Sequence, residues 1–198
     1  MERIDTDAED REDIARLAAG EDDALDALMG RHAGPLFAFL FRWVGNEADA
    51  RDLAQDTFVR VYRSRGSYRR ESRFSTWLLA IAANLARNHR RWHGRHPTTP
   101  LESTTDADAD PRRPSLVEVL PAAGASPAEA LSATERAAAV RAAVNRLPGN
   151  LRMAVVLCEW EERSLAEAAE ILGCSAKAVE SQLYRARRLL RERLQRWL

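Results

Sequence analysis

The stretch SLAEAAEILGCSAKAVESQLYRARRLL, residues 164–190, decides the fold. Ser164 and Glu167 stand at the spacing of a capping box, in which each side chain satisfies an orphan backbone N–H of the other residue. A helix of about eight residues follows, and Gly173 can take the positive φ that a tight turn needs. Ser175 then begins a second, longer helix. A short capped helix, a glycine turn and a long helix are typical of a DNA-binding helix-turn-helix.

The second helix of this motif has an apolar face and a polar face. Its expected buried stripe follows the i, i+4, i+7, i+11 spacing and consists of Val179, Leu183, Ala186 and Leu190. The opposite face carries donors, acceptors and positive charge, as a helix in a major groove requires. The candidate contacts on that face are Lys177, Glu180, Ser181, Tyr184, Arg185 and Arg188. A solvated amphipathic helix is the alternative, and the capped helix and turn immediately upstream favour DNA binding.

The rest of the chain is helical in pattern, because apolar residues recur at helical spacing and β-alternation is absent. Six of the eight prolines fall between His96 and Leu131, in a stretch rich in Ser, Thr and Asp. Such a composition cannot bury enough surface to offset the entropy of ordering. We therefore expect an all-α protein with two small helical domains. Their ranges are 8–96 and 132–198, joined by a flexible linker over 97–131.

Glycines, prolines and capping residues set the expected helix boundaries. In the first domain the spacing predicts helices near 8–19, 21–31, 33–44, 47–64 and 75–93. Gly20, Gly45 and Gly66 stand where helices are expected to stop, and Ser75 or Thr76 can cap the last helix. In the second domain, where Pro148-Gly149 breaks the first pair, the spacing predicts helices near 132–146, 149–160, 165–172 and 176–196.

Composition restricts the class of protein. The 198 residues carry 30 basic and 30 acidic side chains, yet residues 1–30 hold eleven acids against three arginines and residues 177–198 hold seven bases against two glutamates. Each charged pole can therefore serve a different partner. The sequence has no apolar run long enough for a membrane span and no secretory signal, so we expect a cytoplasmic protein without membrane insertion. Cys158 and Cys174 are expected to be small core residues rather than a disulfide or metal site.

A second candidate nucleic-acid site lies between Arg60 and Arg95, where ten arginines meet a single acid. Aromatic residues are interleaved with the arginines, and this combination suits a single strand, because cations follow the phosphates and exposed aromatics stack on unpaired bases. The loop over 68–74 is cationic and has room for a flipped base. On the helix that follows, we expect Trp77, Leu78, Ile81, Ala82 and Leu85 in the core. The opposite, ligand-facing side carries Asn84, Arg87, Asn88 and Arg91.

An acidic row lies between these features. Asp49, Asp52 and Asp56 fall at i, i+3, i+7 on one face of the helix expected over 47–64, beside an apolar stripe. DNA would repel this row and a basic protein surface would attract it. A merely solvated face is an equally good interpretation from the residues alone.

With these segments in place, the chain resembles the sigma-70 family, specifically its compact extracytoplasmic-function group. The resemblance covers about 20–95 and 132–195. It rests on three segments in the family's order: DARDLAQDTFVRVYRS, SRFSTWLLAIAANLARNHRR and, most specifically, AVESQLYRARRLL. Many members carry a second basic residue where Glu180 or Gln182 stands here, so the sequence that the last helix reads cannot be copied from a relative.

The resemblance implies a role for each segment. The first is expected to dock on the clamp coiled coil of the largest subunit of RNA polymerase, through Asp49, Asp52, Leu53, Gln55 and Asp56. The second is expected to melt and read the −10 element. Its implied contacts are the loop residues Tyr68, Arg70, Ser72, Arg73 and Phe74, which capture flipped bases, and the helix residues Asn84, Arg87, Asn88 and Arg91. The helix-turn-helix is expected to read the −35 element.

The implied partners are core RNA polymerase, at its clamp and flap region, promoter DNA and an anti-sigma factor that covers the polymerase-binding surfaces. No catalytic residue, cofactor or metal is expected, because polymerase supplies the active site and its magnesium. A conventional dimeric helix-turn-helix regulator explains 164–196 equally well, but leaves the acidic row and the aromatic site unused. An enzyme is the third class. Its only arguable site, His89, His93 and His96, is surrounded by arginines that would repel a cation.

Overall fold

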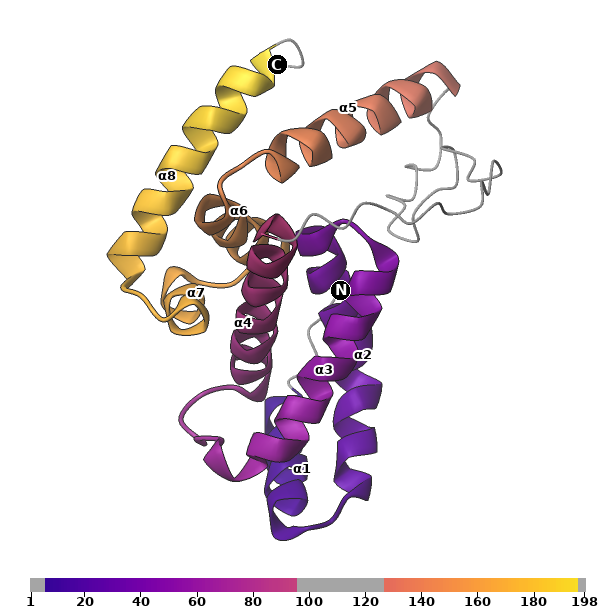
Figure 1. Ribbon diagram of the computed structural model, residues 1–198, viewed down its shortest axis with the longest axis vertical. Coiled ribbons are helices and arrows are strands. Elements are labelled where there is room, and N and C mark those ends of the chain that lie inside the picture. The colour runs from indigo at the N-terminus through magenta and orange to yellow at the C-terminus, as the bar shows by residue number, and fades with distance from the viewer. Residues whose placement is uncertain (1–5, 96–126, 196–198) are drawn as a thin grey trace.

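The computed structural model describes residues 6–95 and 127–195, and the regular elements within these ranges are all helices (Figure 1). The N-terminal part contains α1 (Asp7–Ala19), α2 (Asp23–Val44), α3 (Glu47–Ser64), a short 3-10 turn η1 (Arg65–Ser67) and α4 (Phe74–Arg95). The C-terminal part contains α5 (Pro127–Asn145), α6 (Gly149–Val155), a π-helical turn η2 (Val156–Trp160), α7 (Leu165–Leu172) and α8 (Ala176–Arg193). The all-α prediction with a C-terminal helix-turn-helix is confirmed. None of the described helices is long and apolar enough to cross a bilayer.

Two of the predicted glycine stops end helices in the N-terminal part. Gly20 follows α1 with φ 100° and Gly45 follows α2 with φ 80°, the left-handed conformation that a side chain would strain. Asn46 then caps α3, since its side-chain oxygen accepts a hydrogen bond from the Ala48 backbone N–H at 2.9 Å.

The predicted break between helices at 21–31 and 33–44 is wrong, because α2 is one helix of 22 residues that continues through Pro35. An internal proline costs a helix about 3 kcal/mol. The apolar stripe nevertheless continues on both sides of it, with Leu28, Leu36, Phe39 and Leu40 all buried. Each such side chain contributes about 1.5–3 kcal/mol on burial, so tertiary packing outweighs the local preference.

The predicted cap of the fourth helix is also wrong. Helix α4 begins at Phe74, so Ser75 and Thr76 lie inside its first turn, and the Arg73 carbonyl accepts the N–H of Thr76 at 3.0 Å. Phe74 is 0% exposed, and its burial places the start of the helix against the core.

The first C-terminal helix is longer than predicted. It begins at Pro127, five residues before the predicted start at 132, and proline is favoured at this first helical position, where no N–H is needed. The remaining part of the predicted linker, residues 97–126, lies outside the described residues. A hydrogen bond from Arg193 Nη1 to the Ala143 carbonyl, at 3.2 Å, ties the other end of α5 to α8.

The two helical domains pack directly against each other, chiefly where α4 meets α7 (Figure 1). Their buried apolar side chains form one continuous cluster that extends from Ile14 in α1 to Ala186 in α8. The composition of the linker had predicted two bundles on a tether, and this contact between them was not predicted.

Candidate nucleic-acid and protein interfaces

The helix-turn-helix is built as its sequence predicts. Ser164 Oγ accepts the Glu167 N–H at 3.2 Å, and the Glu167 carboxylate accepts the Ser164 N–H at 3.0 Å. Burial opposes the charge of Glu167, but the backbone and hydroxyl hydrogen bonds from Ser164 outweigh it and lower the pKa of this carboxyl. Gly173 makes the turn with φ 65°, and Ser175 caps α8 through the Ala178 N–H at 3.2 Å.

Helix α8 presents the predicted polar face to solvent. Val179, Leu183 and Ala186 are buried and Leu190 is half-buried, which confirms the apolar stripe. All six predicted contact residues on the other face are exposed, and Tyr184 is the most prominent, with 70% of its surface accessible. Arg185 donates to Ser181 Oγ at 3.2 Å, so two of the six residues form one surface unit. This face has the donors, acceptors and shape that a base edge in a major groove requires.

Cys174 departs from its predicted place. It is exposed at the start of the turn into α8, whereas Cys158 is half-buried and packs against the core. Cys174 lies in the turn itself, between Gly173 in the left-handed conformation and the Ser175 cap, and not on a helix face that packs against the core. Neither thiol is in a disulfide.

Helix α3 carries the acidic row. Asp52, Gln55 and Asp56 are exposed and Asp49 is half-buried, 3.6 Å from His89 Nε2 of α4. Among the described residues no basic side chain forms an ion pair with Asp52 or Asp56, so both carboxylates remain available to a partner. Leu53 is 5% exposed and lies in the core, where it supports the helix rather than presenting its side chain.

The loop over 68–74 rests on an aromatic cluster. Tyr68 lies with its ring centroid 5.3 Å from that of Trp77 and 6.3 Å from that of Phe74, and its hydroxyl donates to the Ser72 carbonyl at 2.6 Å. Burial, and then the negative charge of Asp7 in α1, raise the pKa of the Tyr68 hydroxyl. Phe74 is fully buried under the loop, so it shapes the loop and cannot itself stack on a base.

The exposed groups of this loop are cationic. Arg70 and Arg73 reach solvent and Ser72 is half-buried. On α4, Asn84, Asn88 and Arg91 are exposed and Arg87 is half-buried, in line with the predicted division between core and ligand-facing sides. The two arginines donate to their neighbouring amides, Arg87 to Asn84 at 2.5 Å and Arg91 to Asn88 at 3.0 Å. The loop at the start of α4 and the exposed side of the helix further along it both present cationic groups, and the helix adds amides, which are features that suit a single strand.

The contact between the domains also contains polar pairs. Arg42 Nη1 of α2 donates to Glu161 Oε1, which follows η2, at 2.5 Å, and Arg163 Nη1 donates to Ser75 Oγ of α4 at 3.2 Å. Burial raises the pKa of Glu161, against the lowering effects of Arg42 and Arg163. Neither of these two pairs was predicted. No local pattern in the sequence identifies their members as partners.

An arginine stacks on a tryptophan beside this ion pair. Arg152 of α6 is 5% exposed, lies 5.3 Å from the centroid of the Trp43 ring and donates to the Arg42 carbonyl at 2.7 Å. Arg90 of α4 lies 5.4 Å from the same ring. Burial, and then repulsion from Arg90, lower the pKa of Arg152 to about 10. The sequence gives one signal of this contact, because Arg152 interrupts the apolar run LRMAVVL and a basic residue in a buried helix needs a partner.

A pocket of about 520 Å³ opens beside these arginines, between α4 and the C-terminal domain. Arg87 and Arg91, two of the predicted −10 residues, line it from α4, and Gln182 lines it from α8. The domain contact therefore reaches part of the surface predicted to meet the −10 strand.

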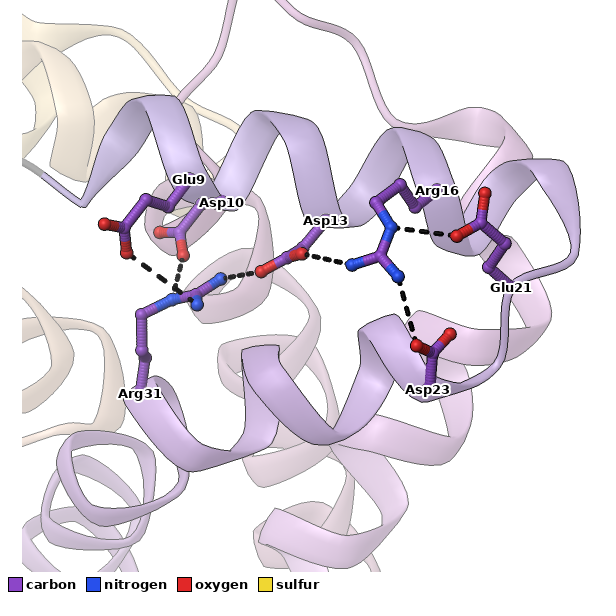
Figure 2. A network of polar contacts seen from close by, with 7 residues as sticks. All are labelled: Glu9, Asp10, Asp13, Arg16, Glu21, Asp23 and Arg31. Carbon is purple, nitrogen blue, oxygen red and sulfur yellow. Dashed lines mark hydrogen bonds and ion pairs between the residues drawn. The ribbon is translucent and has the colours of Figure 1, made fainter.

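A network of ion pairs joins α1 to α2 and accounts for much of the acidic N-terminal pole (Figure 2). Arg31 of α2 points at α1, where its Nε donates to Asp10 at 2.9 Å and its Nη2 to Asp13 at 2.5 Å. Arg16 lies between Asp13 and two further acids, Glu21 and Asp23, at 3.2, 2.9 and 3.0 Å. These acids neutralise arginines within the domain. Burial opposes the charge of Asp10, but hydrogen bonds from His32 and Arg31 outweigh it and lower its pKa.

Among the described residues no group of three or more His, Cys, Asp or Glu could hold a metal ion. His89 faces Asp49, and His96 lies outside the described residues.

Two family profiles match the chain. The profile of Sigma-70 region 2 matches residues 28–96 and that of Sigma-70 region 4 matches residues 137–190, so α1 precedes the first match. The RNA polymerase sigma-H factor of Pseudomonas aeruginosa is 31% identical over 190 residues, which are 96% of each chain. The ECF RNA polymerase sigma-E factor of Haemophilus influenzae is 31% identical over 182 residues, 92% of this chain and 93% of that one.

Solved structures match over most of both chains as well. CnrH, in complex with the cytosolic domain of CnrY, has a TM-score of 0.64 and 28% identity, over 94% of this chain and 97% of that one. The sigma factor RpoE of Bartonella quintana, in complex with the anti-sigma factor NepR, has a TM-score of 0.60 and 25% identity, over 86% and 96%.

Proposed function

Because this chain belongs to the sigma-70 family, as an extracytoplasmic-function sigma factor with regions 2 and 4, we propose that three surfaces divide the work of promoter recognition. Such a factor directs RNA polymerase to promoters and is not itself an enzyme. The first surface is the acidic row on α3, the second is the 68–74 loop with the polar face of α4, and the third is the exposed face of α8.

The α3 row docks on the clamp coiled coil of the largest polymerase subunit. The free carboxylates of Asp52 and Asp56 support this proposal most directly. The loop and the α4 face of the same domain are strongly basic, so the α3 row differs in sign from the surfaces proposed to bind DNA. A surface of this sign repels promoter DNA and attracts a basic protein surface. Gln55 adds a neutral polar contact, and Leu53 holds the helix in place from below.

The loop and the α4 face bind the melted −10 strand. Arg70 and Arg73 meet the phosphates, and the half-buried Tyr68 and Ser72 border the place into which a base can turn. Asn84 and Asn88 supply amide groups beside the strand. Holding flipped bases in fixed positions stabilises the melted state without any chemical step.

Helix α8 reads the −35 duplex. Ser181, Tyr184 and Arg185 lie at the centre of its exposed face, and Arg188 extends the same face along the groove. Arginine can bind guanine edges with two hydrogen bonds, and Lys177 near the helix N-terminus is placed to meet a phosphate. Region 4 also contacts the flap region of polymerase in this proposal.

The two regions separate when the factor works. The −10 and −35 elements are named for positions about 25 base pairs apart, which is about 85 Å at about 3.4 Å per base pair. Domains of this size are each about 30 Å across, so two touching domains reach about 60 Å at most. The packing of α4 against α7 therefore belongs to the factor before it joins polymerase and promoter.

An anti-sigma factor is the further proposed partner. The similar CnrH and RpoE were solved in complex with CnrY and with the anti-sigma factor NepR, respectively. A protein of that kind would hold this chain away from polymerase by covering the α3 row.

Charge reversal tests the docking surface. The double variant Asp52→Arg/Asp56→Arg should lose core polymerase in a pull-down and lose run-off transcription, whereas Glu12→Arg should retain both. Glu12 is an exposed acid on α1 of the same domain and serves as the matched control. Retention of polymerase by the double variant would refute the docking assignment.

A further inference from the structure

We propose that Asp10 of α1 and His32 of α2 are positioning residues for capture of the −10 strand. They act through Phe74, which fixes the floor of the 68–74 loop. The proposal rests on the proposed function of that loop. It also assigns a role to α1, which lies before the residues matched by the region 2 profile.

The chain of contacts begins at a buried carboxylate. Asp10 is 2% exposed, and its two oxygens have different partners. Arg31 Nε donates to Oδ1 at 2.9 Å, and His32 Nε2 lies 2.8 Å from Oδ2. The carboxylate thus fixes the orientation of the His32 ring, as an outer carboxylate orients a histidine in many functional sites.

The His32 ring passes this orientation to the loop. Its centroid lies 5.0 Å from that of Phe74, at an interplanar angle of 56°. Phe74 in turn lies 6.0 Å from Trp77 and 6.3 Å from Tyr68, whose hydroxyl closes the loop on the Ser72 carbonyl. Three side chains therefore connect the Asp10 carboxylate to the backbone of the loop.

Helix α1 also approaches the loop directly. The charges of Asp7 and Arg11 both act on the Tyr68 hydroxyl, and α1 packs against η1, from which the loop departs. Within the loop itself, one turn bond joins the Ser72 N–H to the Arg69 carbonyl at 3.2 Å. This turn, the Tyr68 hydroxyl bond to the Ser72 carbonyl and the aromatic residues beneath together hold the loop.

A buried carboxylate is a costly way to join two helices. Removing charges from water carries a large desolvation cost, and apolar residues of similar volume often serve stability as well or better. What the network supplies is a single orientation of the His32 ring and of the aromatic residues above it. A site that holds a strand in fixed positions gains affinity from such pre-organisation.

Asp13 provides a matched control within the same network. It is also buried and also accepts a hydrogen bond from Arg31, but its other partner is Arg16, and His32 bonds to Asp10 instead. A network that only joined α1 to α2 would use both acids alike. A positioning role predicts that only Asp10 affects the loop, because only Asp10 bonds to His32.

The experiment uses reconstituted holoenzyme and a single-stranded oligonucleotide that carries the non-template −10 element. Asp10→Ala should weaken oligonucleotide binding about tenfold and lower permanganate reactivity of the melted promoter, while core polymerase affinity stays unchanged. Asp13→Ala should change oligonucleotide binding less than twofold. Equal losses for the two variants, or a parallel loss of core affinity, would overturn the proposal.

A second pair of variants tests the path through the histidine. His32→Phe keeps a ring against Phe74 and needs no acceptor, so it should bind the oligonucleotide nearly as the parent does, and His32→Ala should not. In the His32→Phe background, Asp10→Ala should cost nothing further, because coupled residues are not additive. Additive losses would overturn the path. If Asp10→Ala does not fold, the comparison of His32→Phe with His32→Ala tests the positioning role by itself.

The loop assignment has its own control in the same assay. Arg73→Ala alters an exposed loop residue, distant from Asp10 in the chain. If Arg73→Ala leaves oligonucleotide binding unchanged, the proposed function of the loop fails. If Arg73→Ala weakens binding and Asp10→Ala does not, only the positioning role fails.

Discussion

Arg42 and Glu161, separated by 119 positions in the sequence, form a hydrogen-bonded ion pair with 2.5 Å between Nη1 and Oε1. The pair joins α2 of region 2 to the end of η2 in region 4. Both side chains are largely covered, so the pair is far less screened by solvent than an ordinary surface pair. It lies in the contact between the domains, which in the proposed function opens before both promoter elements are reached.

Removal of Arg42 should open the molecule. Arg42→Ala leaves a covered carboxylate without its cation in the closed form, and exposure of Glu161 to water on opening relieves that cost of about 1.5–3 kcal/mol. The radius of gyration measured by small-angle X-ray scattering should therefore rise. Arg51→Ala, which removes an exposed ion pair within α3, should leave it unchanged. The same radius for both variants and the parent would contradict this role of the pair.

Acidification should favour the closed form. Because burial raises the pKa of Glu161 above its ordinary value of 4.5, the closed form holds the proton of this carboxyl more tightly than the open form does. Its contribution to closure is fully present below the ordinary pKa and is lost as the pH rises through the raised one. The scattering radius should thus increase from about pH 4.5 upward. Glu161→Gln should remove this dependence, and a variant as pH-dependent as the parent would assign it to another group.

Replacement of different arginines on α8 should weaken −35 binding to different extents. Arg185→Ala and Arg188→Ala should each weaken holoenzyme binding to the −35 duplex by about 1–3 kcal/mol if they contact bases. Arg187 is paired with Glu159 at 2.7 Å, so Arg187→Ala should have a smaller effect. Footprints over the −35 element at several salt concentrations provide the measurement. Unchanged footprints for Arg185→Ala and Arg188→Ala would refute the assignment of this face.

Loss of the capping box should destabilise the helix-turn-helix. Ser164→Ala removes the acceptor of the Glu167 N–H and a donor to its carboxylate, and loss of such a cap costs about 1 kcal/mol. Thermal unfolding followed by circular dichroism should show a midpoint lower by a few degrees. Ser164→Thr retains the hydroxyl and should restore most of the loss. A midpoint as low in the threonine variant as in the alanine variant would show that the cap is not the cause.

Local signals in the sequence were enough for the helix-turn-helix. The capping box, the glycine turn and the α8 stripe each depend on residues a few positions apart, and local hydrogen bonding determines their geometry. The exposed α8 face followed from the same periodicity. The sequence was a poorer guide where packing between distant segments determines the structure. The continuation of α2 through Pro35 and the burial of Phe74 depend on which surfaces meet in the folded domain.

The polar contacts between elements were beyond prediction for the same reason. Nothing local distinguishes Asp10 from the other acids of the N-terminal pole, and its partners His32 and Arg31 lie more than twenty positions away. Glu161 and Arg42 are ordinary charged residues until the two domains come together. The assignment of individual residues to polymerase and DNA remains a prediction from the resemblance, supported by exposure and charge.

The continuity of α2 makes one rigid rod of two distant sites. At about 1.5 Å per residue its 22 residues extend about 33 Å, with His32 under the loop and Arg42 at the domain contact about 15 Å apart along its axis. Two helices with a joint near residue 32 would let these sites move independently. One helix spans both places, so in the proposed function a tilt of α2 at Arg42 on release of region 4 would also move the ring of His32 beneath the 68–74 loop.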